Sequence, residues 1–197
     1  MRIKESELVV NPDGRVYHLN LAPQELADRV ILVGDPARVS RVAAHFDTVE
    51  LRRENREIHS CTGVYRGKRF TVLSTGMGPD NIDIVLNELD ALKNIDLNTR
   101  EIKPQKTSLE IVRIGTSGSL QRDIPVDSFV VARRAIGFDG VLHFYRSQAV
   151  RQLDIEEEFI RQTAWNPLAA RPYVVEGSEE LFSRLHSEQT IEGFTAT

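Results

Sequence analysis

The 197-residue chain is 41% hydrophobic and 27% charged, a composition typical of a soluble globular protein, and its length suits a single domain over residues 1–197. The net charge of −4 provides no basic field, so we expect no nucleic-acid partner. A single cysteine, a polar N-terminus and the lack of any membrane-spanning apolar stretch favour a cytoplasmic protein without a membrane partner.

The first part of the chain leads into an apolar strand. Residues 1–16 contain the turn signal NPDG and are predicted to form a loose leader. Residues 17–21 (YHLNL) follow, and His18 taken alone is more often a surface or hairpin histidine than a functional one. Residues 29–33 (RVILV) have the continuous apolar pattern of a strand buried on both faces.

The glycine that follows this strand opens a helix predicted over residues 37–46. Asp35 is placed to cap the helix, and Pro36 suits its first position. Arg38 lies in the first turn, where free backbone N–H groups attract anions, although a solvated helix residue is the plainer interpretation. The segment lacks both the dinucleotide-binding pattern and the Walker pattern.

A second strand, predicted over residues 70–74, also ends in glycines, in the sequence TGMGP. Met77 lies between these glycines and is either a core plug or a soft apolar wall for a ligand. A helix is predicted over residues 81–93, with an apolar face made of Ile82, Val85, Leu86, Leu89 and Leu92.

The polar residues 94–108 are predicted to form an exposed inserted loop without a catalytic role. Residues 109–121 (LEIVRIGTSGSLQ) then begin as a buried strand that contains Arg113 and end in a loop with Gly115 and Thr116. Burying a guanidinium is costly unless an anion pairs with it, and glycine-rich backbone can approach such an anion closely. This stretch therefore predicts a strand that presents a positive charge and a hydroxyl to an anionic ligand.

The rest of the chain has a plainer pattern. Strands are predicted over residues 128–135 and 190–197, and helices over residues 154–163 and 179–188. No internal repeat or low-complexity tract occurs. The order of strands and helices indicates the α/β fold class.

Three predicted strands thus end in glycine loops. In open α/β sheets, ligands bind outside the carboxyl ends of the strands. If the three ends converge, Arg38, Arg113 and Thr116 would line one crevice, and their donors suit a tetrahedral oxyanion such as phosphate. The five histidines show no metal-ligand spacing, and no GxSxG sequence occurs.

These loops resemble the three motifs of the nucleoside phosphorylase family and occur in the family's order. Residues 138–144 (FDGVLHF) and the YHLNL segment are similar to its uridine phosphorylase branch. The resemblance covers residues 17–197 and implies a three-layer α/β/α fold around a central mixed twisted β-sheet. The matching segments are VGDPARV (33–39), STGMG (74–78) and RIGTSG (113–118).

The resemblance also implies roles for individual residues. His18, Met77 and Thr116 would contact the nucleoside, and His18 and Arg56 would reach the site of a neighbouring subunit. Glu57 would help to hold a monovalent cation at the dimer interface. The phosphate site would comprise Gly34, Arg38, Arg56, Arg113, Gly115 and Thr116.

The implied reaction is phosphorolysis of a nucleoside, with uridine as the first candidate, to the free base and (deoxy)ribose 1-phosphate. Inorganic phosphate is the co-substrate, no cofactor is required, and the protein is expected to be a homo-oligomer, either a dimer or a hexamer built as a trimer of dimers. The chain is expected to match the N-terminal two-thirds of the family domain. The family's base-recognition segment and ribose-binding Met-Glu motif would come after residue 197, so no catalytic general acid is identified within the chain.

Three alternatives remain at this point. A purine nucleoside phosphorylase would share the phosphate site. A nucleosidase of the same fold would use water, which needs no anion-binding arginines. The third alternative is a module that binds phosphate or a nucleoside without catalysis.

Overall fold

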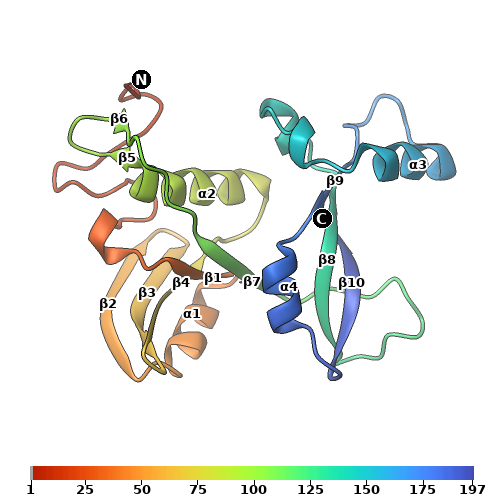
Figure 1. Cartoon of the computed structure of the whole chain (residues 1–197), viewed down its shortest axis with the longest axis horizontal. Coiled ribbons are helices and arrows are strands. Elements are labelled where there is room, and N and C mark those ends of the chain that lie inside the picture. The colour runs from red at the N-terminus through yellow and green to blue at the C-terminus, as the bar shows by residue number, and fades with distance from the viewer. Residues whose placement is uncertain (1) are drawn as a thin grey trace. The chain divides into compact units, whose positions relative to one another are not determined.

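The computed structural model describes residues 2–197, and their contacts form two compact units, one ending at Thr116 and the other running from Ser117 to Thr197 (Figure 1). Each unit has its own β-sheet. The α/β class predicted from the sequence is confirmed, whereas a single domain over residues 1–197 stays a prediction.

The first unit is built on a five-stranded sheet in the order β2-β3-β4-β1-β7. The sheet is mixed, because β1 is parallel to β4 and β7 while β3 is antiparallel to β2 and β4. Its elements are η1 (Pro23–Glu25), β1 (Arg29–Val33), α1 (Pro36–Ala43), β2 (Thr48–Asn55), β3 (Ile58–Tyr65), β4 (Lys68–Ser74), α2 (Pro79–Asn94), β5 (Ile95–Asp96), β6 (Glu101–Ile102) and β7 (Glu110–Ile114).

The alternating side chains of β1 enter two separate apolar clusters. Val30 and Leu32 pack in a cluster with residues of α2, whereas Ile31 and Val33 pack in a cluster with residues of α1. Successive strand residues point to opposite faces of a sheet, so α1 and α2 cover opposite faces. The three-layer α/β/α arrangement is therefore present in the first unit (Figure 1).

Helix α1 begins as the sequence predicts, α2 begins two residues before its predicted start at residue 81, and one predicted core position in α2 is wrong. Asp35 caps α1 by accepting a hydrogen bond from the backbone N–H of Ala37 at 2.9 Å. In α2, Leu86 is 41% exposed, while Glu88 is only 5% exposed. The buried face of the helix thus contains a carboxylate, because polar groups of the chain before η1 satisfy it, as described below.

The leader and the 94–108 segment are more ordered than predicted. Leu8 and Val16 of the leader are buried in the core. Strands β5 and β6 form a small antiparallel hairpin, and the guanidinium of Arg100 beside it donates hydrogen bonds to the backbone carbonyls of Ile3, Lys4 and Leu8. Because Arg100 satisfies several carbonyl groups at once, it fixes the leader and the 94–108 segment to each other. The polar sequences of the two segments do not reveal this order.

The second unit has a three-stranded sheet in the order β10-β8-β9, with β10 parallel and β9 antiparallel to β8. Buried Glu156 accepts hydrogen bonds from Arg151 and from the backbone N–H of Val174, which links α3 to β9. The elements of this unit are β8 (Phe129–Gly137), η2 (Val141–Phe144), η3 (Gln148–Val150), α3 (Leu153–Thr163), β9 (Tyr173–Glu176), α4 (Glu179–Leu185) and β10 (Thr190–Ala196).

Buried Glu25 holds the chain before β1 to the sheet of the first unit. Its carboxylate accepts hydrogen bonds from Arg15 at 2.9 Å, from Arg53 at 2.6 Å and from the backbone N–H of Ala22 at 2.9 Å. Burial opposes ionisation of this carboxyl, but these three donors lower its pKa from 4.5 to about 2.

We predict that Glu25→Gln lowers the free energy of unfolding by about 3 kcal/mol at pH 7, because two guanidinium groups lose a shared buried partner. The folded-state pKa is depressed, so the stabilisation is present above about pH 4.5 and is lost as the pH falls towards 2. Urea unfolding at pH 7 and at low pH measures both effects. Glu50→Gln, which breaks an exposed pair with Arg69, is the matched control and should cost less than about 1 kcal/mol.

Candidate functional site

The carboxyl ends of three strands of the first unit lie side by side. Strand β1 pairs in parallel with β4 and β7, so Val33 lies beside Ser74 and Ile114. Beyond the strands, the backbone N–H of Gly76 donates to the carbonyl of Gly34 at 3.0 Å. The register thus brings the three glycine loops together at one edge, as the sequence predicts.

Two arginines lie at these strand ends. The Nη1 atom of Arg38 donates to the carbonyl oxygen of Ile114 at 3.4 Å. The guanidinium of Arg113 folds back over the loop, since a Cβ atom on Gly115 would lie 2.6 Å from its Nη1 and one on Gly34 would lie 3.9 Å from its Nη2. Among residues 2–197, neither arginine has a carboxylate within ion-pair distance. Two positive charges therefore lie at the strand ends without a counter-charge from the described chain.

The prediction that Arg113 is buried is wrong. Strand β7 is an edge strand of its sheet, and its exposure rises along its length to exposed Arg113 and Ile114. An exposed guanidinium has no need of an anion to offset burial. The case for an anion site therefore depends on the grouping of Arg38 and Arg113 at the strand ends.

His18, Arg56 and Glu57, which are separate in the sequence, line one small cavity of ≈ 60 Å³ within the first unit. Arg56 and Glu57 form the turn between β2 and β3, where Arg56 takes a left-handed conformation with φ of 54°. The other lining residues are Asn55, Ile58, Asn81 and Ile84.

Glu57 connects this cavity to the strand ends. Its Oε1 atom accepts a hydrogen bond from Asn81 at 3.0 Å, and its carbonyl accepts one from the hydroxyl of Ser74 at 2.7 Å. The backbone N–H of Glu57 and the amide of Asn81 lower the pKa of the Glu57 carboxyl, with a further contribution from the charge of Arg56. This side chain also lies against Gly76. The site thus combines positive charges at the strand ends with one carboxylate in the cavity.

Two predicted nucleoside contacts, Met77 and Thr116, are exposed. Met77 is 92% exposed, so its alternative role as a core plug is wrong. Its role as a ligand wall and the role of Thr116 stay predictions. The cation near Glu57 also stays a prediction, and no group of three or more His, Cys, Asp or Glu side chains within residues 2–197 could hold a metal ion.

Three polar residues that hold the cavity walls had no role predicted from the sequence: Asn55, Asn81 and Glu88. Asn55 donates to the carbonyls of Tyr17 and His18. Glu88 offered a signal, because a carboxylate one residue before Leu89 and three after Val85 falls on the apolar face of α2. A charged side chain that is buried on an apolar helix face needs hydrogen-bond or ionic partners, so its presence there predicts such partners.

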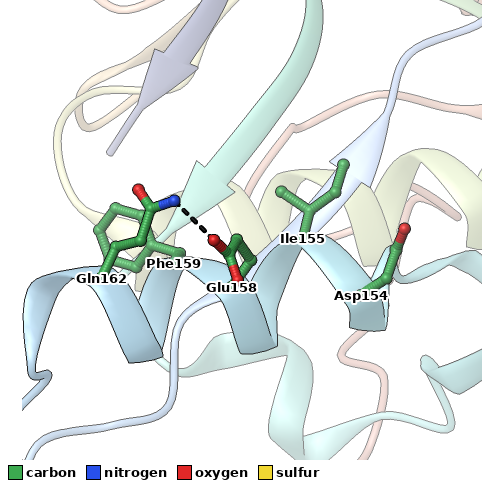
Figure 2. A pocket seen from close by; sticks show the side chains of 5 residues that line it. All are labelled: Asp154, Ile155, Glu158, Phe159 and Gln162. Atoms are coloured by element: carbon green, nitrogen blue, oxygen red, sulfur yellow. Dashed lines mark hydrogen bonds between the residues drawn. The ribbon is translucent and has the colours of Figure 1, made fainter.

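A second hollow, in the second unit, lies along α3 (Figure 2). Two carboxylates, an amide and two apolar side chains line it, and Gln162 donates to Glu158 at 2.6 Å. Carboxylates repel anions, so this surface has the wrong charge for an oxyanion site.

No helix within residues 2–197 combines the length and the apolar character that a membrane span requires.

Comparison with known proteins identifies the class. Residues 28–194 match the phosphorylase superfamily, and the chain belongs to that superfamily. The predicted resemblance to nucleoside phosphorylases is thereby confirmed.

Individual relatives include enzymes for both kinds of base. A DeoD-type purine nucleoside phosphorylase of Thermoanaerobacter sp. (strain X514) is 36% identical over 116 residues, or 58% of this chain and 44% of that protein. The uridine phosphorylase of Thermococcus kodakarensis is 29% identical over 133 residues, or 68% of this chain and 43% of that protein. The chain spans less than half the length of these curated relatives.

Solved structures show the same fold. The crystal structure of Trypanosoma brucei nucleoside phosphorylase, reported to show uridine phosphorylase activity, matches 96% of this chain and 68% of that chain with a TM-score of 0.83 and 32% identity. A purine nucleoside phosphorylase from Toxoplasma gondii, in complex with immucillin-H, matches 100% of this chain and 64% of that chain with a TM-score of 0.61. Its 21% identity shows likeness of fold alone.

The glycine at position 76 provides a test of the site's packing. A Cβ atom there would lie 2.7 Å from Nδ2 of Asn81 and 2.8 Å from Cγ of Glu57, and the φ angle is 68°. We predict that Gly76→Ala costs about 1 kcal/mol for the backbone conformation and about 1–3 kcal/mol more for the displaced side chains. Gly67→Ala is the control, because Gly67 has a φ of 72° and open space around the added atom. If thermal or urea unfolding shows an equal loss of stability in Gly76→Ala and Gly67→Ala, the side chains of Glu57 and Asn81 do not pack closely against Gly76.

Proposed function

We propose that this protein is part or all of a nucleoside phosphorylase that cleaves a nucleoside with inorganic phosphate. The supporting observation is the pair of arginines, Arg38 and Arg113, at the adjacent ends of β1 and β7 without a carboxylate partner among residues 2–197. A guanidinium fork matches the geometry of a phosphate oxyanion, and the N-terminal end of the α1 dipole nearby favours an anion.

The reaction needs little chemistry from these residues. Phosphate attacks C1′ of the nucleoside, the C1′–N bond to the base breaks with its electron pair leaving on the base, and ribose 1-phosphate forms. Arginines at the strand ends hold the phosphate in line with C1′ and stabilise it as the sugar gains oxocarbenium character. Thr116 would bridge phosphate and ribose. We propose that the reaction needs no cofactor. We also propose that a monovalent cation binds near Glu57.

Uridine is the first candidate substrate, supported by the YHLNL and FDGVLHF segments and by the reported activity of the Trypanosoma brucei relative. Purine nucleosides are the second candidate, because a DeoD-type purine nucleoside phosphorylase is 36% identical over 116 residues. Uridine and inosine assayed side by side distinguish the two.

We also propose that the active protein is a homo-oligomer in which His18 and Arg56 complete a neighbouring subunit's site. Both residues line the same small cavity of the first unit. A dimer is the smallest assembly that meets this requirement. Sedimentation that shows an active monomer would contradict it.

Arg113 and Arg38 should govern the phosphate requirement. We predict that Arg113→Ala and Arg38→Ala each raise the KM for phosphate by about 10- to 100-fold, the loss of one charge-assisted contact, with a smaller change in the KM for the nucleoside. Base release measured against phosphate concentration tests this. Arg41→Ala, on an exposed part of α1, is the control and should keep the phosphate KM of the unaltered protein.

The same assay without phosphate separates phosphorolysis from hydrolysis. Base release that is equally fast in phosphate-free buffer would establish a nucleosidase and refute the proposed function. An absence of base release together with phosphate binding at the strand ends would indicate a binding module.

A further inference from the structure

Glu88 is the most densely hydrogen-bonded carboxylate beside the cavity, and neither the proposed reaction nor the motifs use it. It lies on α2 and is 5% exposed. Its Oε2 atom accepts the backbone N–H groups of His18 at 3.0 Å and Leu19 at 2.8 Å, and the His18 N–H also lies 3.1 Å from Oε1. Its Oε1 atom lies 2.6 Å from Nδ1 of the His18 ring. Three nitrogens of the YHLNL segment therefore converge on one side chain.

This arrangement decides which ring nitrogen of His18 carries the proton. An ionised carboxylate is only an acceptor, so the nitrogen that faces it must be a donor. Nδ1 therefore carries a proton. In the neutral imidazole, Nε2 is then unprotonated and is an acceptor. Nε2 has no hydrogen-bond partner among residues 2–197.

Further contacts hold His18 in place. The amide of Asn55 donates to the carbonyls of Tyr17 at 2.8 Å and His18 at 3.2 Å. The Tyr17 ring meets the imidazole edge-on, with centroids 4.9 Å apart. The main chain and the ring are thus fixed from several sides, while the His18 side chain still lines the cavity with Arg56 and Glu57.

We propose that Glu88 is a positioning residue that fixes His18 as the Nδ1–H tautomer, so that Nε2 accepts a hydrogen bond from a hydroxyl donor such as a sugar hydroxyl of the nucleoside. The choice of a sugar hydroxyl rests on the proposed function. The tautomer does not, because it follows from contacts within the first unit. A carboxylate paired to the second nitrogen of an imidazole is a common way to set ring orientation in functional sites.

Glutamine at position 88 should reverse the tautomer. The N–H of Leu19 binds Oε2 alone, and that of His18 lies slightly nearer Oε2 than Oε1. The single oxygen of Glu88→Gln should therefore take the Oε2 place, which leaves its NH₂ group facing Nδ1. Nδ1 must then accept, and the proton moves to Nε2. Asp90→Asn is the matched control: it removes one negative charge from the same helix at an exposed position away from His18.

The experiment is ¹⁵N NMR of the histidine-labelled protein of residues 1–197 at about pH 8.5, where an ordinary imidazole is neutral. His18→Asn identifies the His18 signal. We expect the Nδ1–H tautomer in the unaltered protein and in Asp90→Asn, and the Nε2–H tautomer in Glu88→Gln. An Nε2–H tautomer in the unaltered protein overturns the proposal without any variant, which covers the case in which Glu88→Gln fails to fold. An unchanged tautomer in a folded Glu88→Gln also overturns it.

Kinetics tests the link to the nucleoside. Glu88→Gln should raise the nucleoside KM about tenfold with the phosphate KM unchanged, the opposite of the arginine variants, and Asp90→Asn should change neither. A raised phosphate KM in Glu88→Gln would contradict a role through His18. If the unaltered protein shows no phosphorolysis but its tautomer responds as expected, the proposed function fails while the positioning role of Glu88 stands.

Discussion

The parallel pairing of β1 with β4 on one side and β7 on the other is the constraint on which the candidate site depends. It places Val33 between Ser74 and Ile114, so three loops that are distant in sequence leave the sheet at one edge. The bond from Gly76 to Gly34 continues the pairing beyond the strands. The two arginines are brought together by this fixed register, and a slip of β7 by one residue would turn the Arg113 side chain to the other face of the sheet.

Buried carboxylates organise the structure, while unpaired guanidinium groups mark the site. Glu25, Glu88 and Glu156 each accept several N–H donors, and each fixes a polar segment to an apolar layer. Burying such charges is tolerable because both oxygens of each carboxylate have a donor. Arg38 and Arg113, by contrast, have no carboxylate partner in the described chain. Their position together at the strand ends is what makes these two arginines candidates for function in a phosphorylase-superfamily chain.

The sequence was sufficient for elements with strong local signals. The apolar run of β1, the cap at Asp35 and the long amphipathic α2 were predicted within a few residues of their observed bounds. Strand β2 carries Glu50, Arg52 and Arg53, so no apolar pattern revealed it. The order of the leader was hidden as well, because part of what holds it is Arg100, a residue far along the chain that binds its backbone carbonyls. Leu86 and Arg113 were wrongly predicted to be buried, because the sequence pattern shows which face of an element a residue lies on but not which other elements pack against that face.

The sequence by itself determined the superfamily motifs, the α/β class and the glycine-terminated strands, since these are local properties of composition and spacing. Only the tertiary structure decided that Arg113 lies on an edge strand, that Met77 is exposed, and that His18, Arg56 and Glu57 share one cavity. It also decided the partner of His18. Glu88 is 70 residues away in the chain, and a contact of that range depends on how the helix packs on the sheet.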